Sequence, residues 1–194
     1  MKRVYCIADI GIWIEKDHLL DISWEKFKLI QNEEIFQIEI KVIIPPIDDI
    51  YYSIQKIIIS EGYKIILRIN SDIMIVSENW RICSILPLDN IENLQTFLNQ
   101  IFYTRALYKN IIQLHSSLIK FCEKGIMFLG PSGIGKTTQA ELWNKYRDAL
   151  IINGDIVFVQ ETEENFLGWG TPWHGSSPYC ENTSVPVHAM IVLK

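Results

Sequence analysis

The sequence predicts an α/β protein in which a β-rich N-terminal domain, residues 1–108, precedes an α/β core, residues 109–194. Three observations support this division. The first part is rich in isoleucine and in short runs that alternate apolar and polar residues, the pattern of half-buried strands. Segment 91–108 then repeats apolar residues every three or four positions, as an amphipathic linking helix does. After it, the pattern changes to a buried strand, a glycine-rich turn and a helix.

Short β-like runs follow one another through the N-terminal domain. We expect strands at 4–8, 11–15, 36–42, 56–60, 64–69, 73–76 and 81–86. Pro45 and Pro46 end the third run, because proline cannot donate to a strand ladder, and a short helix is expected over 47–54. Turn residues separate the last four runs, which favours an antiparallel meander. Asp89 or Asn90 can cap the linking helix.

The second part alternates strands with one helix. We expect strands at 111–119, 125–129, 149–153, 156–160 and 189–193, and a helix at 136–146. Segment 161–188 contains many glycines, prolines and threonines, so we expect it to be loop-rich.

Composition excludes several classes of function. The chain is 48% hydrophobic and 21% charged with a net charge of −5, values that are typical of a globular protein. It has no basic stripe, so we expect no nucleic-acid partner. It has no apolar run long enough for a membrane span and no recognisable signal peptide, so we expect no membrane contact and a cytoplasmic location. Four dispersed cysteines favour free thiols over disulfides or a zinc site: Cys6, Cys83, Cys122 and Cys180.

Residues Gly130–Thr137 match the phosphate-binding pattern G-x-x-x-x-G-K-[ST] at every fixed position. Triphosphate oxygens need converging backbone N–H donors, which only a tight, glycine-rich loop can bring close enough. Lys136 would contact the β- and γ-phosphates, and the Thr137 hydroxyl would ligate Mg²⁺. The alternative is a glycine-rich turn without a ligand, but the expected strand before the loop and helix after it favour a P-loop. The predicted nucleotide-binding residues are Gly130, Ser132, Gly133, Ile134, Gly135, Lys136, Thr137 and Thr138.

Asp155 is the predicted catalytic and metal-binding carboxylate. It follows the expected strand 149–153, which should end at the same edge of the sheet as the phosphate loop. A carboxylate there can hold Mg²⁺ and accept the proton of an attacking hydroxyl. We therefore expect Asp155 and Lys136 to be catalytic, and Thr137 and Asp155 to bind the metal. The alternative is a turn aspartate that caps the strand end.

From His115 onward the sequence resembles the kinase core shared by HPr kinase/phosphorylase and ATP-dependent phosphoenolpyruvate carboxykinase. The resemblance lies in residues 114–117, 130–138, 153–155, 170–175 and 185–187. It is most similar to diverged HPr-kinase-like proteins of bacterial peptide-modification clusters, some of which phosphorylate a serine of a ribosomally made precursor peptide. The resemblance implies a P-loop core of the HPr kinase/carboxykinase type, with ATP and Mg²⁺ as cofactors.

Two departures from that family change the expectation. The family usually has two adjacent acids where this chain has Gly154 and Asp155, so either one carboxylate serves both as metal anchor and as base, or activity is weak. The family's core also continues beyond the position of Lys194, so we expect residues 109–194 to be an incomplete core.

Several residues have two interpretations each. His115 either orients phosphates or, as we favour, is a hydrogen-bonded core histidine, and His174 lies either in a loop that closes over the site or in a plain surface loop. Trp169 and Trp173 either stack on the base or acceptor or, as we favour, pack internally. Three acids either form a solvated turn or help to bind the metal: Glu161, Glu163 and Glu164.

Three functions remain open. The favoured one is an ATP-dependent kinase that acts on a serine or threonine hydroxyl of a peptide or protein. A carboxykinase-type enzyme is disfavoured, because a second metal cluster and an arginine set for a dicarboxylate are missing. A non-catalytic or truncated nucleotide-binding regulatory module fits the missing acid. The expected partners are a nucleotide, a peptide or protein acceptor, and either a second copy of the chain or a complementing chain.

Overall fold

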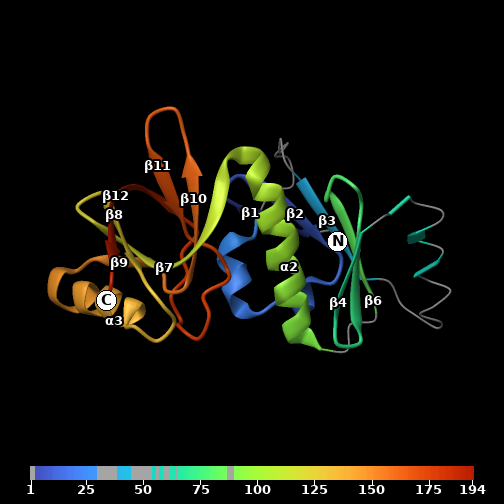
Figure 1. The fold of residues 1–194 in the computed structure, drawn as a ribbon, viewed down its shortest axis with the longest axis horizontal. Coiled ribbons are helices and arrows are strands. Elements are labelled where there is room, and N and C mark those ends of the chain that lie inside the picture. The colour runs from blue at the N-terminus through green and yellow to red at the C-terminus, as the bar shows by residue number, and fades with distance from the viewer. Residues whose placement is uncertain are drawn as a thin grey trace. The chain divides into compact units, whose positions relative to one another are not determined.

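The computed structural model describes residues 3–29, 39–44, 54–55, 57–58, 62–63, 65–86 and 90–194. The chain divides into two compact units. The first comprises Met1–Ile22 and Lys28–Arg105, and the second comprises Ser23–Phe27 and Ala106–Lys194. Within the described residues the content is mixed α/β, with two six-stranded sheets and few helices (Figure 1). The predicted α/β class is therefore confirmed at this level.

The sheet of the first unit has the order β1-β2-β3-β6-β5-β4. Its strands are β1 (Arg3–Ile7), β2 (Ile10–Ile14), β3 (Glu39–Ile43), β4 (Ile65–Ile69), β5 (Asp72–Val76) and β6 (Ile82–Leu86). β1 and β2 form an antiparallel hairpin, and β3 pairs in parallel with both β2 and β6. The predicted antiparallel meander is confirmed for β4, β5 and β6. Isoleucine fills much of the interior, as its β-branched side chain packs well on a pleated surface.

One predicted strand of this unit is wrong. Segment 56–60 was expected to be extended, but Ile57 and Ile58 are helical, as is Ile54. Their spacing of three and four residues places them on one helical face, which packs against a buried cluster of Tyr63 and neighbouring side chains. The predicted helix 47–54 lies, except for its last residue, outside the described residues. So do residues 36–38 of the predicted third strand, the proline pair at 45–46 and residue 89.

The predicted linking helix is confirmed as α2 (Ile91–Ala106), which a 3-10 turn, η3 (Leu107–Lys109), continues. Asn90 caps it, because its Oδ1 accepts a hydrogen bond from the Glu92 N–H at 2.8 Å. The buried Asp72 carboxylate accepts from the Asn90 N–H and from Asn93 Nδ2. The start of α2 is thereby tied to the start of β5.

The sheet of the second unit closes on itself. Its strands are β7 (Ile111–Phe121), β8 (Lys124–Leu129), β9 (Leu150–Asn153), β10 (Ile156–Glu161), β11 (Phe166–Trp169) and β12 (Ser184–Val192). β7 pairs with β10, β10 with β11, β11 with β12, β12 with β8, and β8 again with β7. β9 pairs with the second half of β7, beyond the residues that pair with β10. The long strand β7 (yellow in Figure 1) thus joins the closed circuit to β9.

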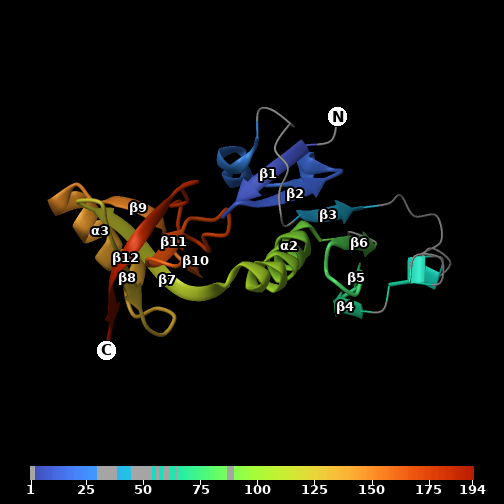
Figure 2. The same cartoon turned by 90° about the horizontal axis from the view of Figure 1, so that it is seen from above.

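Alternating side chains divide the core of this unit into two clusters. Leu118, Met127 and Ile152 face the inside of the circuit with Val157, Val159 and Val185. Their chain neighbours Ile119, Phe128 and Ile151 face the other way, because successive side chains of a strand point to opposite faces. There they pack with Ala140 of α3 (Lys136–Arg147), which lies over β7, β8 and β9 (Figure 1 and Figure 2).

β12 begins at Ser184, inside the segment expected to be loop-rich and before the expected strand 189–193. Two further features of this unit were not predicted. β11 lies in a segment expected to be loop, and its four residues include Gly168. A Cβ on Gly168 would come within 2.8 Å of Leu118. The glycine therefore lets the Leu118 side chain pack directly against the backbone of β11 and does not mark a turn. The second feature is η2 (Ile22–Phe27), a 3-10 helix whose residues Ser23–Phe27 belong to this unit although they come from the N-terminal part of the chain. The 3-10 helix η1 (Asp17–Leu19) precedes it in the first unit.

None of the four cysteines forms a disulfide in the structure. Among the described residues, none of the helices combines the length and the apolar character that a membrane span requires.

Candidate active site

The loop between β8 and α3 exposes backbone groups at the start of a helix. Residues 131–134 are exposed, and α3 begins at Lys136. Gly133 and Gly135 have φ angles of 78° and 100°, which side chains with a Cβ rarely adopt. No side chain accepts a hydrogen bond from the N–H groups in the first turn of α3. Such a helix start attracts anions.

The predicted nucleotide-binding residues differ in exposure. Ser132, Ile134 and Thr138 are exposed, whereas Lys136 is buried with 6% of its surface accessible. The Lys136 ammonium donates to the carbonyls of Gly130 and Pro131, each at 3.1 Å. The loop therefore folds around the ammonium, which keeps the positive charge at the loop.

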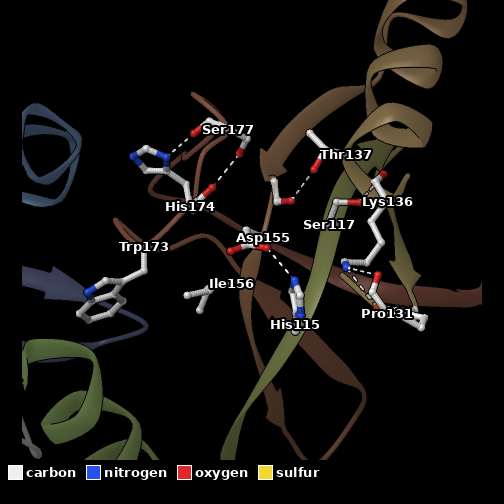
Figure 3. Close-up of polar contacts among 12 residues, drawn as sticks. His115, Ser117, Pro131, Lys136, Thr137, Asp155, Ile156, Trp173, His174 and Ser177 are labelled. Carbon is white, nitrogen blue, oxygen red and sulfur yellow. Dashed lines mark hydrogen bonds and ion pairs between the residues drawn. The ribbon is translucent and has the colours of Figure 1, made fainter. Parts of the chain in front are cut away.

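Two hydroxyl groups tie the start of α3 to the sheet. Ser117 of β7 is fully buried and donates to the Lys136 carbonyl at 2.9 Å. The Thr137 hydroxyl donates to the Gly154 carbonyl, also at 2.9 Å (Figure 3). β9 and β8 are both antiparallel to β7, so they run in the same direction and end at the same edge. The structure thereby brings Thr137 beside the turn that carries Asp155.

The Asp155 carboxylate contacts a histidine ring. His115 Nε2 lies 2.8 Å from Asp155 Oδ1, and about half of the His115 side chain is exposed (50%). The core position that we favoured for His115 is therefore wrong. Ser116 N–H also donates to the Asp155 carbonyl at 2.9 Å, which fixes the backbone of the aspartate against β7.

Asn153 is a site residue that the sequence interpretation missed. Its fully buried side chain accepts hydrogen bonds at Oδ1 from the N–H groups of Asp155 and Ile156, at 2.9 and 3.0 Å. Its Nδ2 donates to the carbonyls of Thr171 and Trp173, at 3.0 and 3.1 Å. One amide thus connects the turn of Asp155 to the loop 170–179. An asparagine that accepts from the backbone two residues later is a common turn former, and this was the available signal.

The loop 170–179 covers the Asp155 turn. Gly175, with a φ of 61°, packs so closely on the Asp155 carboxylate that a Cβ there would collide with Oδ2. Within the loop, His174 Nδ1 contacts the Ser177 carbonyl, and Ser177 Oγ donates to the His174 carbonyl at 2.8 Å (Figure 3). His174 therefore lies in a loop at the site, but its ring contacts that loop itself.

Trp169 and Trp173 both pack against other protein groups, as we favoured. Trp173 is 6% exposed and stands edge-on to Trp24 of η2, with ring centroids 5.3 Å apart. Trp169 Nε1 donates to Gln160 Oε1 across the β10–β11 hairpin at 3.1 Å. Both rings thus have protein partners.

The acids at 161–164 lie away from the Asp155 turn. Asp155 precedes β10 and Glu161 ends it, so the length of a strand separates them. Glu163 and Glu164 are exposed in the turn that follows. This arrangement supports the solvated-turn interpretation.

The residues of this site suit Mg²⁺ only if phosphate oxygens complete its coordination shell. Over the described ranges no three acids, histidines or cysteines group as a metal site. The protein offers the Asp155 carboxylate and the Thr137 hydroxyl, which contacts Gly154, the residue before Asp155. Mg²⁺ is often held by one or two carboxylates while substrate phosphates and water complete its shell, so this donor set suits a metal that arrives with a nucleotide.

Comparison with known proteins gives a weak structural likeness. No family model and no curated protein matches the chain. A solved structure of the Hpr(Ser) kinase/phosphatase from Coxiella burnetii matches with a TM-score of 0.34 and 15% identity, over 41% of this chain and 63% of that one. The chain thus spans less than two thirds of that structure, and a similarity this low assigns no family.

Proposed function

We propose that the chain binds the phosphates of ATP, together with Mg²⁺, on Gly130–Thr137 and transfers the γ-phosphoryl group to a serine or threonine hydroxyl of a peptide or protein. One observation carries the proposal: the Thr137 hydroxyl donates to the Gly154 carbonyl at 2.9 Å. This bond holds the start of α3 against the turn that bears Asp155. A phosphate-binding loop and a carboxylate on one edge of a sheet are what phosphoryl transfer by positioning and charge stabilisation needs.

Each residue has a defined role in this proposal. The N–H groups of the first turn of α3 donate to phosphate oxygens, and Lys136 neutralises charge on the β- and γ-phosphates. The oxygen of the acceptor hydroxyl bonds to the γ-phosphorus while the bond from that phosphorus to ADP breaks. Asp155 accepts the proton that the hydroxyl releases. His115 holds Oδ1 of that carboxylate and so orients it. Bound Mg²⁺ would stabilise negative charge on the phosphates.

Calorimetry tests the binding part of the proposal. Lys136→Ala removes a buried cation, so ATP should bind at least about tenfold more weakly in Mg²⁺ buffer, as expected for a charge-assisted hydrogen bond. Lys145→Ala is the matched control, because Lys145 lies exposed further along the same helix. Equal ATP affinities of Lys136→Ala and the wild type would show that the loop is not the site.

A transfer assay separates a kinase from a binding module. Asp155→Asn should retain most of the nucleotide affinity but lower γ-phosphate transfer to a peptide acceptor by roughly 10²–10⁴-fold, the range for a general base. Asp148→Asn, at the exposed C-cap of α3, should retain the wild-type transfer rate. ATP hydrolysis replaces the transfer readout where no acceptor is known.

A second candidate function is a nucleotide-binding regulatory module without catalysis. Gly154 favours it, because this residue stands where the resembling family has a second acid, and across the described residues no acidic cluster replaces that acid. A wild-type chain that binds ATP, yet neither transfers phosphate nor hydrolyses ATP, would establish this alternative.

A further inference from the structure

Ser177 covers the α-carbon of Gly154. An ideal Cβ on Gly154 would collide with Ser177 Oγ and would lie 2.8 Å from Ser177 Cβ. The same position is 3.7 Å from the methyl carbon of Thr137. The Ser177 side chain therefore fills the space that any side chain at position 154 would take, at the side of Thr137.

The two hydroxyl groups beside Gly154 are in the same hydrogen-bonding state. Thr137 Oγ1 donates its proton to the Gly154 carbonyl, and Ser177 Oγ donates its proton to the His174 carbonyl. A hydroxyl group has one proton and two lone pairs. Because both protons point to backbone carbonyls, the remaining lone pairs of both oxygens can only accept a hydrogen bond or ligate a cation.

The same loop also fixes the carboxylate of the site. Gly175 packs against Asp155, and the Ser177 N–H donates to the His174 carbonyl at 3.3 Å. Three oxygen-bearing side chains thus lie next to Gly154: Thr137 of α3, its chain neighbour Asp155, and Ser177 of the loop 170–179. Asp155 provides the one carboxylate among them.

We propose that Ser177 is a further residue of the magnesium–nucleotide site and that its hydroxyl oxygen accepts from a water of the Mg²⁺ shell, in the place of a side chain at position 154. This rests on the proposed function. Mg²⁺ retains several of its waters when it is bound through one carboxylate and phosphates. Neutral oxygens that hold those waters strengthen such a site, and loss of one typically costs about 10–100-fold in metal affinity.

The first test measures the contribution of Mg²⁺ to nucleotide affinity by calorimetry, with Mg²⁺ and with EDTA. Ser177→Ala should lower ATP affinity about tenfold in Mg²⁺ and by less than about twofold in EDTA. Ser176→Ala is the control, because Ser176 is the exposed neighbour in the same loop. A Ser177→Ala chain with the Mg²⁺ dependence of wild type would overturn the role of Ser177 alone. A wild-type chain that binds no ATP would overturn the proposed function and this inference together.

The second test exchanges the two side chains. Gly154→Asp alone should lower the melting temperature, because its Cβ meets Ser177. Gly154→Asp combined with Ser177→Gly should regain most of that loss and should depend on Mg²⁺ at least as strongly as wild type, since a carboxylate then replaces the hydroxyl. Ser177→Gly alone provides the reference. A double variant no more dependent on Mg²⁺ than Ser177→Gly, or phosphate found on Ser177 by mass spectrometry after incubation with Mg-ATP, would overturn the assignment.

Discussion

Asn153 and Asp155 are joined by a hydrogen bond of 2.9 Å from the Asp155 N–H to Asn153 Oδ1. The same buried amide donates from Nδ2 to the carbonyls of Thr171 and Trp173. The position of the candidate catalytic carboxylate is therefore set by one side chain that itself faces away from solvent. Disturbing that side chain should affect both the turn and the loop that covers it.

Replacing Asn153 by alanine should destabilise the protein by about 3 kcal/mol, because several buried backbone groups lose their hydrogen-bond partner. Urea denaturation of the full chain measures the loss. Asn182→Ala is the matched control: its exposed amide donates one hydrogen bond, to the Lys26 carbonyl, so the expected loss is below about 1 kcal/mol. Similar losses for the two variants would contradict a special role for Asn153.

Thr137→Val retains the shape of the side chain but removes its oxygen. We expect ATP affinity to fall about tenfold more in Mg²⁺ than in EDTA, because one metal ligand is lost. The lost hydrogen bond to the Gly154 carbonyl should also cost about 1 kcal/mol of stability. Thr138→Val, one position further and exposed, should leave the Mg²⁺ dependence unchanged. An equal affinity loss in both buffers would remove Thr137 from the metal shell.

Gly175→Ala should impair phosphate transfer more than folding. The new Cβ would collide with the Asp155 carboxylate, and the φ of 61° disfavours alanine by about 1 kcal/mol. Gly62→Ala isolates the backbone contribution, because Gly62 has a similar φ of 69° and a Cβ added to it would meet no described heavy atom within 4 Å. We expect both variants to lose similar stability and only Gly175→Ala to lose transfer. Wild-type transfer by Gly175→Ala would show that the carboxylate position is not critical.

Trp24 should be essential to the second unit although it lies far away in the chain. It is buried, with 1% of its surface exposed, and packs edge-on against Trp173, so truncation to alanine should cost about 3–5 kcal/mol. Tryptophan fluorescence should report altered surroundings of Trp173 in Trp24→Phe, which retains an aromatic ring. Ile22→Ala provides the control, because Ile22 is 85% exposed. A Trp24→Ala chain as stable as Ile22→Ala would rule out this packing role.

Cysteine labelling tests whether the Cys83 thiol is buried in the first unit. Cys83 is buried and Cys122 is exposed, and burial raises the pKa of the Cys83 thiol because a thiolate would lose its hydration. In iodoacetamide at pH about 8, Cys122 should react as a free thiol and Cys83 only after unfolding. Because the pKa of Cys83 is higher in the folded than in the unfolded chain, its protonated thiol stabilises the fold fully below the unfolded pKa of about 8.5. That stabilisation is lost as the pH rises above this value. Peptide mass mapping that finds equal labelling of the two thiols would contradict this.

Local patterns in the sequence predicted much of the second unit, and long-range packing set the rest. The strand–loop–helix order around Lys136 was predictable because each element shows its own periodicity and turn residues. The place of Asp155 at the same sheet edge followed from chain order. Ser177 against Gly154 and Trp24 against Trp173 were not predictable, because such contacts between distant segments leave no local pattern. His115 lies in the largely apolar segment 111–119, which favoured a core position, although its side chain contacts the partly exposed Asp155.

The closed circuit of strands has a consequence for how the protein is made. β12 pairs in parallel with β8, which is synthesised about sixty residues earlier, and the Leu193 N–H donates to the Leu129 carbonyl at the start of the phosphate loop. The circuit cannot close on the ribosome until Ser184–Val192 has emerged. Until then β8 has one free edge, a common site of association between incomplete chains. The loop 130–135 therefore gains its full support only after β12 has been made.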